Sequence, residues 1–251
     1  MKKSKLFLLI TLGITLFSVS CKDDEASTTP NGENPTSTVC YLKEVKQNEV
    51  IVQKFEYENN ILTKMITNDT LGNETSYNTF EYDNNKLIKI NMYDDDTLWQ
   101  YAECDRTNGR LIKRRRFSDG TLIMYDTLIY NSNNKVEKVD FYNTNNTIIM
   151  SQRMIWDNNN IIDTKLYQNN GGELAFYYGF SYSNFDIKKS PYSPSCFNDI
   201  FFTGDNNYTT MKFYSLSDTS SGDYVYEYNS YGYPIKSTYD DNVLEYIYDC
   251  H

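Results

Sequence analysis

Side chains that could perform acid–base or nucleophilic chemistry are scarce in this chain of 251 residues. His251 is its one histidine, so a Ser–His–Asp or Cys–His arrangement, or a histidine-based metal site, would depend on that position alone. With 34 acidic residues, some pair will lie at the separation of a glycosidase site by chance, and such a pair carries no signal. The sequence therefore predicts no enzyme and no cofactor.

Two short charged runs could bind ions. Asp94–Asp96 offers carboxylate oxygens to Ca²⁺, but it lacks the spacing and the glycine of a calcium loop, so we interpret it as a solvated turn and predict no metal site. Lys113–Arg116 is basic and could bind an anionic glycan. In a strand, however, alternate side chains point to opposite faces of the sheet, which would divide this run between them.

An internal repeat defines the elements that would position these side chains. The chain repeats one phrase between Phe55 and Cys250: aromatic, any residue, aromatic, a turn rich in Asn and Asp, apolar, any residue, Lys. A period of about 20–26 residues indicates a repeat architecture. The second aromatic of the phrase, which we call the anchor, falls at Tyr57, Tyr82, Tyr130, Trp156, Tyr182 and Tyr228.

Each phrase predicts a strand, a tight polar turn and a second strand. Asn and Asp suit such turns because they adopt the left-handed conformation and bond to their own backbone. In the strand near Leu87, alternation with a period of two places Ile88, Ile90 and Met92 on one face. The prediction is an all-β fold, an antiparallel meander of about 16–18 strands in hairpin repeats, with no helix.

The two ends of the repeat region predict that the meander closes. Cys40–Val45 reads as the second half of a phrase and Tyr246–Cys250 as the first half. Pairing these halves would rebuild one hairpin and remove both sheet edges, and open edges invite aggregation. We therefore expect a barrel or a flattened roll. A round barrel would enclose water, whereas a flattened one could pack its aromatic residues across a narrow core.

The cysteines offer several disulfides. Besides Cys21, the chain has Cys40, Cys104, Cys196 and Cys250, which allow three pairings, and no pair has the spacing of a zinc site. Closure of the sheet would bring Cys40 and Cys250 together, so a disulfide between them is a candidate. Cys104 and Cys196 are then the remaining pair.

The first residues read as an export signal. Met1–Lys5 is basic, Leu6–Phe17 is apolar but too short to span a membrane, and small residues precede Cys21. This arrangement resembles a bacterial lipoprotein signal, although Ser18 replaces the usual Leu. The resemblance implies cleavage before Cys21 and acylation of that residue by fatty acids such as palmitate. Ordinary secretion, with Cys21 as a spare thiol, is the alternative.

The residues after Cys21 refine the predicted location of the protein. Lys22–Glu25 resembles the acidic tag that sends lipoproteins of Bacteroidetes to the cell surface; otherwise it is the polar start of a linker and the protein faces the periplasm. Ala26–Ser37 has the composition of a flexible tether. We divide the chain into a signal peptide (1–20), a tag and tether (21–38) and one β-repeat domain (39–251), held at the outer membrane by lipid.

Charge and composition restrict the partners. The net charge of −10, more negative still without the basic signal residues, argues against nucleic acid, which rewards positive charge. The 24 Tyr and 13 Phe suit β surfaces, and exposed rings could stack on sugars. We expect a monomer whose partner, beyond the membrane, is a glycan or another surface protein.

Three Asp-Thr-Leu segments resemble the O-glycosylation site of Bacteroidetes. The threonines are Thr70, Thr97 and Thr127. We expect each of them in or beside a turn, where a bulky sugar could be accepted.

The Tyr-Asp phrase, as in Phe80–Asp83, is similar to the YD repeat of Rhs-type proteins, although most copies lack its Gly and Arg. Signal, acidic tag and Tyr-Asp hairpins together resemble an uncharacterised family of Bacteroidetes surface lipoproteins with a porin-like fold. The resemblance spans roughly Cys40–His251 and implies a fold and a location, but no activity. A non-catalytic structural or binding scaffold is the leading hypothesis. A glycan- or protein-binding module for nutrient uptake is second, and a glycan-processing enzyme third.

Overall fold

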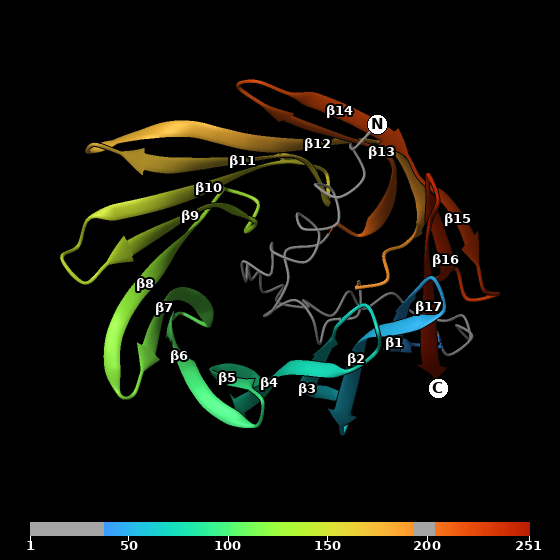
Figure 1. Cartoon of the computed structure of the whole chain (residues 1–251), viewed down its shortest axis with the longest axis horizontal. Helices are drawn as coiled ribbons and strands as arrows, with labels where there is room; N and C mark the ends of the chain where they lie inside the picture. The colour runs from blue at the N-terminus through green and yellow to red at the C-terminus, as the bar shows by residue number, and fades with distance from the viewer. Residues whose placement is uncertain (1–37, 193–203) are drawn as a thin grey trace, which may run out of the picture.

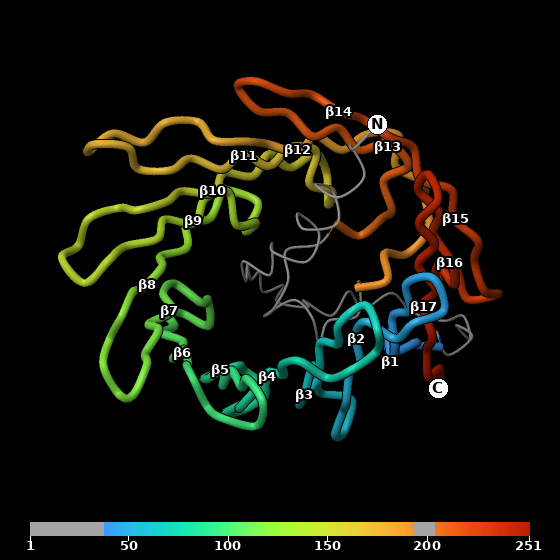
Figure 2. The backbone as a smooth tube through the Cα atoms, in the orientation of Figure 1, coloured from blue at the N-terminus to red at the C-terminus, as the bar shows by residue number. Residues whose placement is uncertain are grey.

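The computed structural model describes residues 38–192 and 204–251. In these residues seventeen antiparallel strands form one sheet, and no helix occurs. Consecutive strands pair with each other except β14 and β15, and β1 pairs with β17 as well as with β2, so the sheet closes into a barrel (Figure 1). The predicted all-β meander and its closure are confirmed, and the backbone traces a rounded ring instead of a flattened roll (Figure 2).

The strands range from 4 to 17 residues in length and are joined mostly by tight turns. They are β1 (Cys40–Gln47), β2 (Val50–Glu58), β3 (Ile61–Asn68), β4 (Glu74–Asp83), β5 (Lys86–Asp94), β6 (Thr97–Thr107), β7 (Arg110–Ser118), β8 (Thr121–Tyr130), β9 (Val136–Asn143), β10 (Ile148–Asp157), β11 (Asn160–Asn170), β12 (Glu173–Lys189), β13 (Asn206–Ser215), β14 (Thr219–Asp223), β15 (Val225–Tyr228), β16 (Pro234–Tyr239) and β17 (Asn242–Cys250). Only Tyr224 separates β14, which pairs with β13, from β15, which pairs with β16.

The Asn-rich turns of the phrase have the backbone that the sequence predicts. Asn59 and Asn60 have φ angles of 51° and 64°, and Asn84 and Asn85 have φ angles of 47° and 59°. Two successive residues with positive φ give a two-residue hairpin turn whose twist matches that of the strands. Asn tolerates this conformation better than other residues with a side chain, which explains its abundance in the phrase.

Three of the six anchor residues bind a backbone carbonyl of the preceding hairpin. The hydroxyl of Tyr57 donates to Leu42 O at 2.8 Å, and that of Tyr130 donates to Leu111 O at 2.7 Å. Trp156 does the same through Nε1, which lies 2.7 Å from Val136 O. The strand register shifts at each of these anchors, because a β-bulge adds one residue to the opposite strand. The phrase thus encodes a bulged hairpin and its bond to the next one.

The bulge corrects one expectation of simple alternation. Tyr82 pairs with Leu87 and Glu81 with Lys89, so Ile88 is the extra residue of this bulge. Leu87 is fully buried, whereas Ile88 is 40% exposed. The prediction that Ile88 shares the buried face of Ile90 was therefore wrong, since the extra residue reverses the alternation locally.

The hydrophobic core lies on the inner side of the ring. Phe55, Met65 and Ile90 belong to one buried cluster, and Val139 and Phe141 belong to a second. Beyond β12 the chain turns into the ring (Figure 1), where Tyr192 packs on the first cluster with its ring centroid 6.5 Å from that of Phe55.

Tyrosines with buried hydroxyls are concentrated on and beside strands β12–β17. Burial raises the pKa of the hydroxyls of Tyr182, Tyr192, Tyr208, Tyr226, Tyr246 and Tyr248, and it raises the pKa of Tyr224 to about 12. A buried tyrosinate would lose its hydration, so each of these hydroxyls stays protonated over the physiological range.

The ladder between β1 and β17, which we call the seam, closes the ring. Cys40 lies directly opposite Cys250, and their sulfur atoms are 2.08 Å apart in a disulfide. Val39 and His251 extend the seam by exchanging two backbone hydrogen bonds of 3.1 Å. The structure therefore contains the cysteine pair that the two half-phrases predicted. Cys196, the expected partner of Cys104, falls outside the described residues.

Candidate functional site

A groove of about 360 Å³ opens beside the seam, and we call it the seam groove. Strands β1, β2 and β17 and the β2–β3 turn supply its walls. Its lining combines aromatic rings, amides and charged groups: Tyr41, Lys43, Phe55, Glu56, Tyr57, Asn59, Asn60, Asp249 and His251.

Aromatic rings in the seam groove pack against each other. The imidazole of His251 stacks on Tyr41 with a centroid distance of 5.3 Å and an interplanar angle of 23°. Tyr41 also meets Tyr57 edge to face, at 5.4 Å and 62°. Such aromatic contacts hold the rings in fixed orientations, so the groove has a preformed apolar wall.

Polar groups stand beside this wall. Nε2 of His251 lies 3.0 Å from Oδ1 of Asn60, and Nζ of Lys43 lies 3.4 Å from Oδ2 of Asp249. Within the described chain, the imidazole of His251 contacts the amide oxygen of Asn60 and the ring of Tyr41. This arrangement can bind and orient a ligand.

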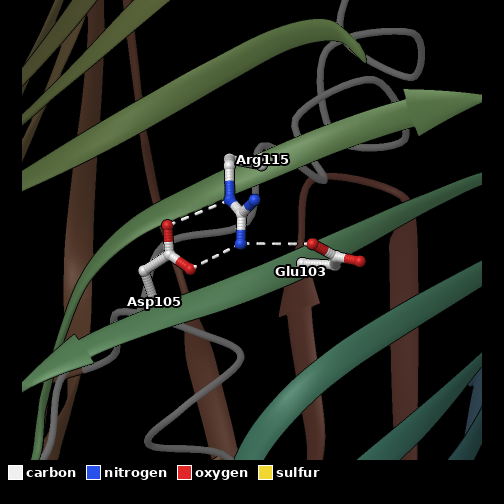
Figure 3. Close-up of polar contacts among 3 residues, drawn as sticks. All are labelled: Glu103, Asp105 and Arg115. Carbon is white, nitrogen blue, oxygen red and sulfur yellow. Dashed lines mark hydrogen bonds and ion pairs between the residues drawn. The ribbon is translucent and has the colours of Figure 1, made fainter. Parts of the chain in front are cut away.

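The basic run Lys113–Arg116 is divided between the two faces of the barrel, as strand alternation predicts. On the outer face, Arg115 donates from Nε to Asp105 at 3.0 Å and from Nη2 to the same carboxylate at 2.8 Å (Figure 3). Glu103 lies 3.2 Å from the same guanidinium, and the bonds from Asp105 raise the pKa of Arg115. Lys113 lies over the ring of Tyr125, 4.0 Å from its centroid.

The inner half of the run contains a buried ion pair. Arg114 donates from Nε to Oδ2 of Asp126 at 2.8 Å, and both residues are 2% exposed. Burial raises the pKa of the Asp126 carboxyl, and the neighbouring Arg114 opposes that rise. Burial also lowers the pKa of Arg116, and the positive charge of Arg114 adds to this effect. The basic run is therefore no continuous anionic-glycan surface.

The sequence alone did not identify Asp126 as the partner of Arg114. Only the register between β7 and β8 places Asp126 opposite Arg114. A signal was present, because an acid and an arginine on neighbouring strands require each other when both are buried.

The remaining candidate sites lie apart from the seam groove. Asp94–Asp96 is an exposed hairpin turn, and no group of three metal-ligating side chains occurs in residues 38–192 and 204–251. Thr70 and Thr97 lie in or beside turns, but Thr127 lies within β8, so its expected place beside a turn was wrong. The turn at Asp119 and Gly120 ends before β8 begins at Thr121, which leaves Thr127 in the middle of the strand. Cys21, the predicted lipidation site, is outside the described residues.

Comparisons with known proteins show the fold. No family model and no curated protein matches the chain. A porin-like protein of Bacteroides uniformis is 13% identical, with a TM-score of 0.55, over 86% of this chain and 98% of that one. A porin-like protein of Bacteroides vulgatus is 11% identical, with a TM-score of 0.48, over 84% and 99% of the two chains.

The porin-like barrel fold implied by the family resemblance is thus confirmed by the first of these structures, and likeness at this identity shows the fold alone. A structure of TarM matches at a TM-score of 0.20, over 39% of this chain and 20% of that one, and carries no argument. No helix in the described part of the chain is long and apolar enough to cross a membrane.

Proposed function

We propose that the chain is a non-catalytic lipoprotein of the outer membrane whose β-barrel stands in water at the cell surface, held by acyl chains on Cys21. The observation that carries this proposal is the charged outer wall of the barrel, because it distinguishes a tethered barrel from one embedded in lipid.

Ion pairs occupy the outer wall on nearly every hairpin. In β5, for example, Ile90 belongs to the inner core, whereas its neighbour Lys89 faces outward and lies 3.6 Å from Glu81. Each Lys or Arg at the midplane of a membrane barrel's lipid face would cost about 2–4 kcal/mol. The pairs are Lys43 with Asp249, Lys64 with Glu74, Lys89 with Glu81, Arg115 with Asp105 and Glu103, Lys138 with Asp140, Lys165 with Asp163, and Lys236 with Glu227.

A barrel whose outer wall faces water needs a separate attachment to the membrane, and the N-terminal sequence offers one. Two or three acyl chains on Cys21 would bind the membrane stably, since each buried methylene contributes about 0.8 kcal/mol. The tether Ala26–Ser37 would then separate the barrel from the lipid.

Fractionation of cells tests the lipid attachment and the orientation of the barrel together. Cys21→Ser should move the protein from the membrane fraction to the soluble fraction, with Cys104→Ser as the matched cysteine control that stays in the membrane. Protease added to intact cells should digest the wild-type barrel. Membrane retention of Cys21→Ser would refute the lipid attachment. Protection of the barrel from protease until the cells are lysed would place it in the periplasm.

The seam groove favours saccharide binding as a second candidate function. Saccharides bind to aromatic surfaces through their C–H faces and to amides and carboxylates through their hydroxyls, and Tyr41, Asn60 and Asp249 offer these groups side by side. Tyr41→Ala should abolish the retention of neutral oligosaccharides measured by glycan array and calorimetry. Tyr177→Ala, which removes an exposed tyrosine of β12, should leave it unchanged; equal retention by both variants would refute the site.

A further inference from the structure

Three of the four charges in the basic run Lys113–Arg116 are matched by neighbours. Lys113 lies over Tyr125, Arg115 binds Asp105 and Arg114 binds Asp126. Arg116 differs from them, because within the described chain no hydrogen bond or ion pair joins its guanidinium to another group.

The surroundings of Arg116 are apolar on both sides. In the strand register Arg116 lies between Ala102 of β6 and Met124 of β8, on the inner face of the barrel. Gln100 shares that face, two residues from Ala102 along β6. Arg116 is half-buried, so water or a solute still reaches it.

The charge balance of this inner patch is positive. The carboxylate of Asp126 accepts from Arg114 at 2.8 Å, and it attracts Arg116 through space without a hydrogen bond between them. Arginine remains protonated under these conditions, so the patch holds two positive charges against one negative charge. A guanidinium that loses hydration without gaining a partner costs free energy, and its planar donors match the oxygens of an oxyanion.

We propose that Arg116 binds an oxyanion inside the barrel: the carboxylate, sulfate or phosphate group of a small ligand. The guanidinium supplies a two-pronged set of N–H donors, and Gln100 occupies the next position on the same face of β6, diagonal to Arg116. The site lies on the inner face and is independent of both the lipid anchor and the seam groove.

Titration of the full-length protein in detergent with sodium sulfate, sodium phosphate and glucuronate tests this site. Binding is followed by NMR of the arginine Nε–H groups, with sodium chloride at equal ionic strength as the reference. The wild type and Arg115→Gln should respond in a saturable manner to at least one oxyanion. Arg116→Gln should lose at least about tenfold in affinity, as expected for the loss of a charge-assisted pair.

The three anions separate the sources of the ligand. A tighter response to glucuronate than to either inorganic anion would assign the site to an acidic sugar, and equal responses would assign it to oxyanions in general. Arg116→Lys keeps the charge without the two-pronged geometry, and its affinity should fall between those of the wild type and Arg116→Gln. Absence of saturable binding to the wild type, or equal affinity in Arg116→Gln, would overturn the proposal, and the wild-type result stands even where a variant does not fold.

Discussion

Cys40 and Cys250 are direct cross-strand partners, with Cα atoms 4.0 Å apart, although 210 residues separate them in the sequence. The disulfide thus joins the first strand of the ring to the last. It also fixes the register of the seam, because a slip of one residue would move Cys250 away from Cys40.

Removing this disulfide should destabilise the barrel. The double variant Cys40→Ser/Cys250→Ser should lower the free energy of unfolding by about 2–5 kcal/mol, since a crosslink that closes a long loop restricts the unfolded chain strongly. Urea unfolding followed by tyrosine fluorescence measures the change. Reduction of the wild type by dithiothreitol provides the control and should produce a loss of similar size; full stability after both treatments would show that the seam needs no crosslink.

The anchor hydroxyls should contribute measurably to stability. Tyr130→Phe removes the donor that lies 2.7 Å from the carbonyl of buried Leu111, and the unfolding free energy should fall by about 1–3 kcal/mol because that carbonyl loses its bond. The matched control is Tyr231→Phe, whose ring is 49% exposed and whose change should be close to zero. Equal stability of the two variants in denaturant unfolding would contradict the role of the anchor.

Two consecutive arginines should respond differently to the same substitution. Arg114→Gln leaves Asp126 buried without its charged partner and should cost about 3–5 kcal/mol. Arg115→Gln breaks ion pairs with carboxylates that are more than one third exposed, and it should cost no more than about 1 kcal/mol. Thermal unfolding of both variants gives the comparison, and a larger loss for Arg115→Gln would mean that the two faces of β7 have been assigned the wrong way round.

Stability should decline at alkaline pH because of the inner tyrosines. Burial raises the folded-state pKa of Tyr224 to about 12 and also raises those of Tyr208 and Tyr246, whereas the unfolded chain loses these protons near pH 10. The folded state therefore binds more protons than the unfolded state above about pH 10, and linkage makes the unfolding free energy fall as the pH rises through that range.

Urea midpoints at about pH 8, 9, 10 and 11 should stay level up to about pH 9 and then decrease. The part of the tyrosinate absorbance that belongs to the buried tyrosines should appear in this range only as the protein unfolds. Tyr224→Phe should reduce the decrease, and an unchanged midpoint up to about pH 11 would exclude the linkage.

The sequence predicts most of this fold because each repeat contains both strands of a hairpin and the turn between them. Asn59–Asn60 and Asn84–Asn85 mark turns by residue type alone, and the half-phrases at Cys40 and Cys250 predict closure. Ile88 could not be placed correctly, since a bulge depends on the hydrogen-bonding partner strand and not on the local pattern.

The candidate sites were less predictable than the fold. Tyr41, Asn60 and Asp249 come from three segments of the chain and meet only because the ring closes. Similarly, the alternation of Lys113–Arg116 was predictable, but the partners that leave Arg116 unmatched come from neighbouring strands. Local patterns specify strands and turns, whereas a site depends on which strands become neighbours.

The seam also has a consequence for folding kinetics. Outside the seam, every strand ladder joins strands that follow one another in the sequence, and only the connection between β12 and β13 is long. Nearly all of the sheet can therefore grow hairpin by hairpin at low contact order. The ladder between β1 and β17 alone requires the closure of a loop that spans the whole domain. Closure of the ring is therefore the step at which the barrel becomes cooperative, and any hairpin turn could serve as new termini in a circularly permuted chain whose old ends are joined across the seam.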